Sequence, residues 1–361
     1  GVIAFIGLQL TALIVVGLYP PLVNYLPNRV SFLGEASPPP RNPRLQYCVE
    51  QYTHSQFTDN RSAIDAAIAK AQKLDYSVLP TKLEKQASGS FAKATESMDL
   101  LAKAKEAEAA VDAATGTYRP LHTIVRNVES DIRDLDTEIE ELKTLASRAR
   151  GPENETRRKR YETRIEAAEA EKVELAKGIP TEWEDRQAGF VKLNKAESGL
   201  RAKFRRAADD SYAAITKVKA TLDSNEIFAE LEEELMAIRG KVAAALPADI
   251  HETVNELSKK FGEVAGADAI KKALLGARRA LKNRKPNQEK AFTEIDKALK
   301  AYKDQKVWRS GASAKLSTGL TEYEAIARDT FGIRAQPGLT RDQGLFMAGC
   351  MSDHRDISLN F

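Results

Sequence analysis

A heptad repeat in the middle of the chain constrains the fold more than any other sequence feature. Apolar residues recur between positions 121 and 149 in alternating steps of four and three, and charged residues fill most other positions. This spacing keeps a narrow apolar stripe on one side of a helix, which suits packing along another helix. We therefore expect an interaction seam here. It consists of Leu121, Val125, Val128, Ile132, Leu135, Ile139 and Leu142, and Ala146 and Ala149 continue the repeat.

A second apolar stripe follows the first after a short break. Gly151 and Pro152 stand between the two, and both residue types interrupt helices. Lys172 interrupts the second stripe, which is otherwise in phase. Two stripes of similar length with a short connection predict an antiparallel coiled-coil hairpin over residues 120–179. The second stripe consists of Tyr161, Ile165, Ala168, Leu175 and Ile179.

The composition favours helices throughout the chain. Of the 361 residues, 30% are charged and only 7% are aromatic, and alternating β-branched runs are absent. This composition is typical of long helices. We predict an all-α protein in which a single N-terminal transmembrane helix precedes an elongated helical bundle containing the hairpin.

The transmembrane prediction rests on the first residues of the sequence. No charged residue occurs from Gly1 to Tyr19, and the apolar character continues to Leu26, which is long enough to cross a bilayer. A signal peptide is the competing interpretation, but its apolar region is normally shorter and its cleavage site closer. A buried core helix is the other alternative, and it lacks a second apolar segment to pack against. We expect residues 1–27 to be a membrane anchor.

Prolines dominate the next segment. Residues 28–46 contain Pro38, Pro39, Pro40 and Pro43, which favour an extended, semi-rigid spacer. Arginines after the anchor favour a cytoplasmic location for the rest of the chain. Because one N-terminal anchor most simply displays the large soluble part outside the cytoplasm, we nevertheless expect that part to be extracytoplasmic, in the periplasm, an organelle lumen or the extracellular space.

The remaining chain is expected to form three regions. Glycine, proline and capping residues mark helix boundaries inside them. We expect residues 116–120 to end a helix that begins at Thr81, and Thr321 to start a helix separate from the one that ends at Trp308. The regions are a long-helix bundle over 47–246, a shorter-helix bundle with a basic face over 247–332, and an irregular tail over 333–361.

The basic face admits two interpretations. Residues 271–309 contain thirteen Lys or Arg and four Asp or Glu, whereas the whole chain carries a net charge of +3. A solvated helix face is the simpler interpretation, and a phosphate-binding surface is the alternative. Because the segment carries no aromatic-interleaved basic motif of the kind found in nucleic-acid modules, we expect no nucleic-acid partner.

Catalytic signatures are missing from the sequence. It contains no phosphate loop, dinucleotide fingerprint, nucleophile elbow or H-E-x-x-H motif. We therefore predict that the protein is not an enzyme and needs no cofactor or metal.

The two cysteines stand near the two ends of the chain. Cys48 and Cys350 form a possible disulfide if this part of the protein is exported. With His54 and His354 they offer the ligand types of a zinc site, although the spacing is unusual for one. Two free thiols are the third possibility.

Together these features favour a non-catalytic, membrane-anchored scaffold, tether or accessory subunit of a larger membrane protein assembly. Its predicted partners are other subunits or a second copy, through helical seams, and the lipid bilayer, through residues 1–27. An exported helical sensor or ligand-binding domain is the alternative function.

Overall fold

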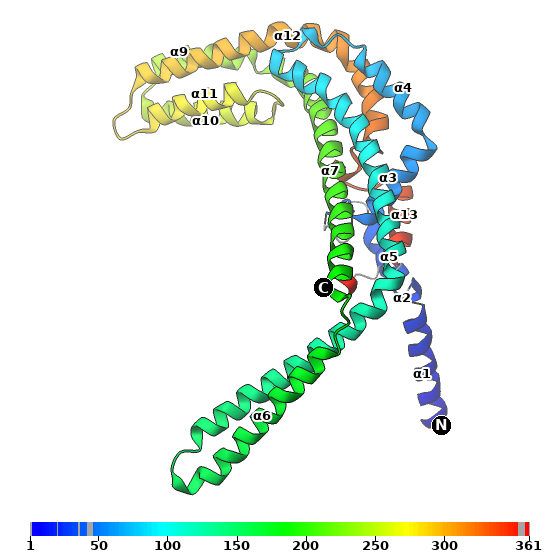
Figure 1. Ribbon diagram of the computed structural model, residues 1–361. Coiled ribbons are helices and arrows are strands. Elements are labelled where there is room, and N and C mark those ends of the chain that lie inside the picture. Colours follow the sequence, from blue (N-terminus) through cyan, green and yellow to red (C-terminus); the bar gives the residue numbers. More distant parts are fainter. Residues whose placement is uncertain (1, 20, 35–36, 42–45, 353–357, 361) are drawn as a thin grey trace. The chain divides into compact units, whose positions relative to one another are not determined.

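The computed structural model describes residues 2–19, 21–34, 37–41, 46–352 and 358–360, and every regular element within these ranges is a helix. The all-α prediction is therefore confirmed. Figure 1 shows the order of the helices along the chain, and the chain divides into two units. Unit 1 comprises Gly1–Asp99 and Lys203–His354, and unit 2 comprises Leu100–Ala202 and Arg355–Phe361. The units do not divide at residue 246, because the long helices α5 (Thr81–Arg148) and α7 (Trp183–Asp223) each contribute to both.

The N-terminal apolar segment is two helices rather than the single one expected. Helix α1 spans Val2–Leu18 and α2 spans Pro21–Phe32, with a bend of 66° between them. Pro21 cannot donate the backbone hydrogen bond that would continue α1, so a proline at the start of a new helix accounts for the break.

The expected spacer is partly helical and packed onto unit 1. Helix α2 continues to Phe32, and Ser37 is buried, with its carbonyl accepting a 2.8 Å hydrogen bond from the Leu339 amide. Phe32 meets helix α13 (Arg341–Ser352) at Gly344, where a Cβ would lie 2.5 Å from the Phe32 carbonyl oxygen. The extended-spacer prediction is wrong here, because these tertiary contacts hold the segment against the unit. Residues 35–36 and 42–45 of the expected spacer lie outside the described residues.

Helix α5 runs through the break that was expected at residues 116–120. Proline inside a helix costs about 3 kcal/mol. Tyr118 and Val125, on either side of Pro120, are buried in a cluster with Trp183 and Phe190. Burying a large apolar side chain stabilises by about 1.5–3 kcal/mol, so this packing offsets the cost of the proline.

Helices α8 to α12 surround one apolar core in unit 1. These are α8 (Asn225–Glu230), α9 (Glu232–Ala244), α10 (Pro247–Glu263), α11 (Asp268–Lys282) and α12 (Gln288–Arg328). Gly266, with a φ of +78°, permits the turn between α10 and α11. Asn287 caps α12 by accepting a 2.8 Å hydrogen bond from the Lys290 amide. Helices α3 (Tyr47–Asp59) and α4 (Arg61–Gln72) pack beside α13 and α12 respectively.

Two further sequence expectations are wrong. Helix α12 continues through Thr321, because its buried positions keep helical spacing across the expected break at Ala312, Leu316, Leu320 and Tyr323. The tail is not irregular, since it contains α13. Thr340 and Gln343 exchange side-chain and backbone hydrogen bonds at its start, which is the capping-box arrangement.

Candidate functional site

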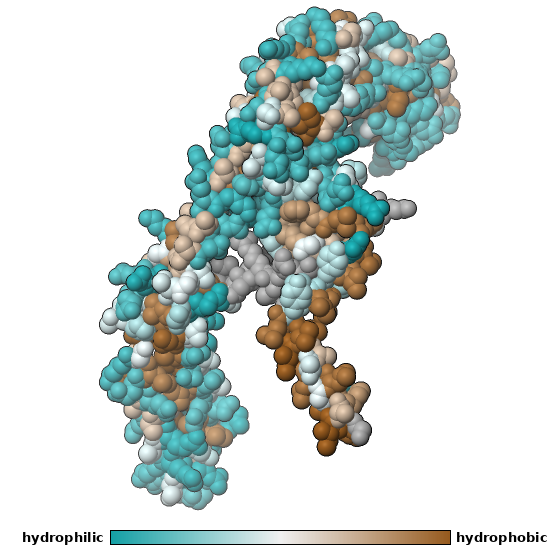
Figure 2. Space-filling view, turned by 90° about the vertical axis from the view of Figure 1, so that its right-hand side faces the viewer, coloured by the Kyte–Doolittle hydropathy of each residue, from teal (hydrophilic) through white to brown (hydrophobic). Residues whose placement is uncertain are grey.

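Helix α1 exposes an apolar surface along its whole length. Every side chain in it is exposed, including Ile3 at 88% and Leu18 at 80% (Figure 2). The hydroxyl of Thr11 donates to the Gly7 carbonyl at 2.8 Å, so the helix itself satisfies that polar group. In the part of the chain that the structure describes, no single helix is long and apolar enough to cross a bilayer, and α1 reaches that requirement only jointly with α2, across their bend.

The exposed apolar surface of α1 is large enough for its burial to contribute a large free energy. Burying a large apolar side chain is worth about 1.5–3 kcal/mol, so covering the Val, Ile, Leu and Phe side chains of α1 is worth on the order of 20 kcal/mol. A typical domain is stable by only about 5–15 kcal/mol. A surface of this size therefore favours an apolar environment or partner.

The predicted seam is used inside unit 2. Each of its residues is buried or half-buried, and so are Tyr161, Ile165, Ala168, Leu175 and Ile179 on the second stripe. Figure 1 shows α6 (Glu155–Lys177) beside the second half of α5. Their contacts run in opposite order along the two helices. Glu138 forms an ion pair with Arg164, and Asp136 forms one with Lys172. Val128, earlier on α5, lies beside Gly178, just after the end of α6. The seam is therefore not an open surface for a partner.

A cavity of about 510 Å³ lies in unit 2 between α5 and α7. Helix α5 supplies Tyr118, His122 and Arg126, and α7 supplies Trp183 and Gln187, at the four-residue steps that place side chains on one helix face. Leu359, near the C-terminus, completes the lining. The sequence shows these helical spacings, but nothing in it indicates that the two faces meet or that Leu359 joins them.

Aromatic rings form one wall of this cavity. The Tyr118 ring stacks on Phe190 with centroids 4.0 Å apart and on Trp183 at 5.8 Å. Burial raises the pKa of the Tyr118 hydroxyl, so the group remains a neutral hydrogen-bond donor at physiological pH. The wall is apolar with a few polar groups nearby, as in many small-molecule sites.

A largely buried ionic network includes Glu197, one of the residues that line the cavity. Arg201 lies between Glu197 and Glu108, with N–O distances of 2.9 Å to each, and Lys105 approaches Glu108 at 2.7 Å. The two cations balance the two carboxylates, which permits their burial. Glu197 also lines the cavity, so the network fixes the position of one carboxylate there.

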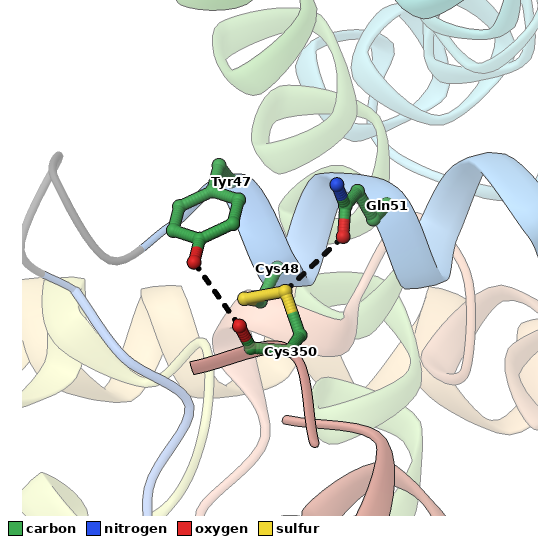
Figure 3. The surroundings of a disulfide bond; sticks show 4 residues. All are labelled: Tyr47, Cys48, Gln51 and Cys350. Atoms are coloured by element: carbon green, nitrogen blue, oxygen red, sulfur yellow. Dashed lines mark hydrogen bonds between the residues drawn. A yellow bond between two sulfur atoms is a disulfide. The ribbon is translucent and has the colours of Figure 1, made fainter. Parts of the chain in front are cut away.

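The structure joins Cys48 of α3 to Cys350 of α13 in a disulfide bond, with the Cα atoms 5.7 Å apart. Figure 3 shows the Tyr47 hydroxyl donating to the Cys350 carbonyl at 3.1 Å, and the Gln51 side-chain oxygen 3.1 Å from the Cys350 sulfur. A disulfide uses both sulfurs that the zinc alternative requires. His354, the fourth ligand of that alternative, lies outside the described residues.

Metal ligands do not gather elsewhere in the described ranges, where no three His, Cys, Asp or Glu side chains form a group able to hold an ion. Comparison with known proteins gives no match to a family model, a curated protein or a solved structure.

Proposed function

We propose that this protein is a non-catalytic helical scaffold, tether or accessory subunit of a membrane assembly, anchored by its N-terminal helices. The exposed apolar surface of α1 carries the proposal. The hydrocarbon core of a bilayer is about 30 Å thick, and the 17 residues of α1 extend about 25 Å, so the helix fits with a small contribution from α2.

The base of the anchor is tied to unit 1, which supports a tethering role. Helix α2 packs on α13, and the disulfide links α13 to α3. Disulfides persist in oxidising compartments, so this bond supports an extracytoplasmic location for the unit.

The hairpin is proposed to be an antiparallel coiled coil that presents its outer face to partners. Its apolar stripes lie buried or half-buried, and the charged residues around them are mostly exposed. Leu145 and Val173 are exposed apolar residues on this outer face. Such a surface suits reversible contacts between subunits rather than chemistry.

Membrane attachment is tested by substituting Leu10→Arg and Leu13→Arg together in α1. An arginine near the centre of a membrane helix costs about 3 kcal/mol, so the pair costs on the order of 6 kcal/mol. We expect the wild-type chain to stay with membranes during carbonate extraction and the variant to be released. A Leu10→Ile, Leu13→Ile variant is the control and should behave as the wild type. Retention of the arginine variant, or release of the wild type, would refute the anchor.

Partner binding is tested by removing residues 136–172 and joining the ends with a short Gly-Ser linker. Asp136 and Lys172 are in contact, so such a linker spans the cut without disturbing the rest of unit 2. We expect this variant to remain in the membrane and to lose the proteins that co-purify with the wild type in mild detergent. Unchanged co-purification would contradict the scaffold role of the hairpin.

The cavity of unit 2 favours a second candidate, an exported ligand-binding domain. Its lining residues all lie outside the deleted segment. If the protein is a ligand-binding domain, small molecules that raise the melting temperature of the wild type should do the same for the deletion variant, because binding to the folded state alone raises stability.

A further inference from the structure

The groove between α11 and the first half of α12 concentrates positive charge. Lys272 and Arg279 are seven residues apart on α11, and Lys290 and Lys297 are seven apart on α12, so each pair lies on one helix face. All four line a groove of about 540 Å³ in unit 1, together with Asn283. The opposite face of α11 is buried in the core through Ile270, Leu274, Ala277 and Leu281.

The only carboxylate among the lining residues is already neutralised. Glu294 pairs with Lys297 at 2.6 Å. Gly276 of α11 makes room for it, because a Cβ there would lie 2.8 Å from the Glu294 carboxylate. Within the described ranges, Lys272, Arg279 and Lys290 have no carboxylate within 4 Å.

Some cations of this helical bundle that lie outside the groove form ion pairs between helices. Lys260 of α10 meets Glu234 of α9 at 2.7 Å, and Lys306 of α12 meets Glu232 of α9 at 2.6 Å. Arg239 likewise meets Asp296 at 3.0 Å. Among the described residues, Lys272, Arg279 and Lys290 of the groove have no such partner.

Three unpaired cations around one groove repel one another, and an anion between them would remove that repulsion. An arginine offers a planar fork for phosphate oxygens, lysines add point charges, and Asn283 adds an amide. We propose that the groove between α11 and α12 binds a multiply charged phosphate group. The group belongs either to a free polyphosphate or to a phosphoinositide headgroup, which share this chemistry.

The test titrates the detergent-purified full chain by calorimetry with tripolyphosphate and, separately, with glycerophosphoinositol bisphosphate. We expect binding of at least one probe, which weakens as salt rises because the contacts are ionic. Tighter binding of tripolyphosphate would identify the ligand of the groove as a free polyphosphate. Tighter binding of the inositol compound would identify it as a lipid headgroup. Absence of measurable binding for both probes would overturn the proposal.

The decisive comparison uses Lys272→Gln, Arg279→Gln and Lys290→Gln in one variant. Each charge-assisted contact is worth about 1.5–3 kcal/mol, so we expect a loss of affinity on the order of 100-fold or more. The control variant, Lys241→Gln, Lys259→Gln and Lys303→Gln, removes the same charge from exposed sites of the same bundle that do not line the groove. Its affinity for the probe should be within about threefold of that of the wild type. Equal losses in both variants would show a diffuse field instead of a site. All six positions are exposed, so equal melting temperatures check that both variants fold.

Discussion

Reduction of the Cys48–Cys350 disulfide is expected to lower the free energy of unfolding of this protein by about 5 kcal/mol, because the bond closes a loop across a separation of 302 residues. Loop-closure entropy grows with the logarithm of loop length, so this bond is near the upper end of what one disulfide contributes. Urea unfolding of the oxidised and reduced chain measures the difference as a shift of the midpoint.

The local consequence is specific to α13. This short helix is held by the disulfide, by α2 and by the apolar contacts of Met347. We expect backbone amides over residues 341–352 to exchange with solvent much faster after reduction, whereas those in the α9–α12 core stay protected. A Cys48→Ala, Cys350→Ala variant is the control, since its stability should not respond to reductant. Rapid alkylation of both thiols in untreated native protein would show that the bond does not form.

Substitution of Arg309 by methionine is expected to lower the free energy of unfolding by about 3–5 kcal/mol. Arg309 is 2% exposed, and its guanidinium donates to the Thr221 carbonyl at 2.7 Å and to the Ala265 carbonyl at 2.6 Å. Thr221 lies in the last turn of α7, and Ala265 lies just beyond the end of α10. One cation therefore satisfies carbonyls at the ends of two helices, where helix dipoles favour positive charge.

The surroundings of Arg309 explain why the charge is tolerated. Its guanidinium carbon lies 4.3 Å from the centre of the Phe228 ring, and Gln305 accepts a 3.1 Å hydrogen bond from it. Burial lowers the pKa of Arg309 to about 10, so the side chain is still charged at neutral pH. Methionine fills similar space but removes the guanidinium donors from both carbonyls. The Ser224 hydroxyl lies 3.0 Å from the Thr221 carbonyl and 3.4 Å from the Ala265 carbonyl, and its single proton can serve only one of them. Each charge-assisted hydrogen bond that is lost costs about 1.5–3 kcal/mol, and a buried carbonyl left without a donor costs about 1–3 kcal/mol.

Lys306→Met provides the matched control for Arg309→Met. Lys306 is on the same helix, and its pair with Glu232 is largely exposed, so the expected cost is below about 1 kcal/mol. Thermal and urea unfolding of both variants measure the two costs. Equal stability of Arg309→Met and the wild type would show that other contacts hold α7 and α10 to α12.

Local patterns in the sequence predicted helices well and their ends poorly. The heptad positions from Leu121 to Ala149 are buried or half-buried as their spacing requires. The expected breaks near Pro120 and Thr321 are absent, because packing of buried side chains outweighs the local preference of a single residue. The capping box at Thr340 and Gln343 was present in the sequence and would have revealed α13.

The candidate sites also differ in how much of them the sequence predicts. The apolar N-terminus and the excess of basic residues between 271 and 309 are visible in the sequence, since composition alone defines them. The sequence does not show the groove that is lined by Lys272, Arg279 and Lys290, nor the cavity beside Tyr118 and Trp183. Each of them forms only where two helices meet.

The sequence by itself determined the all-helical class and which face of each helix is apolar, because these follow from the periodicity of the residues along one helix. Only the tertiary structure decided which faces meet. It brings together Cys48 and Cys350, and it places Arg309 at the ends of two helices. Such contacts join residues far apart in the chain, and their free energy depends on packing that no local pattern records.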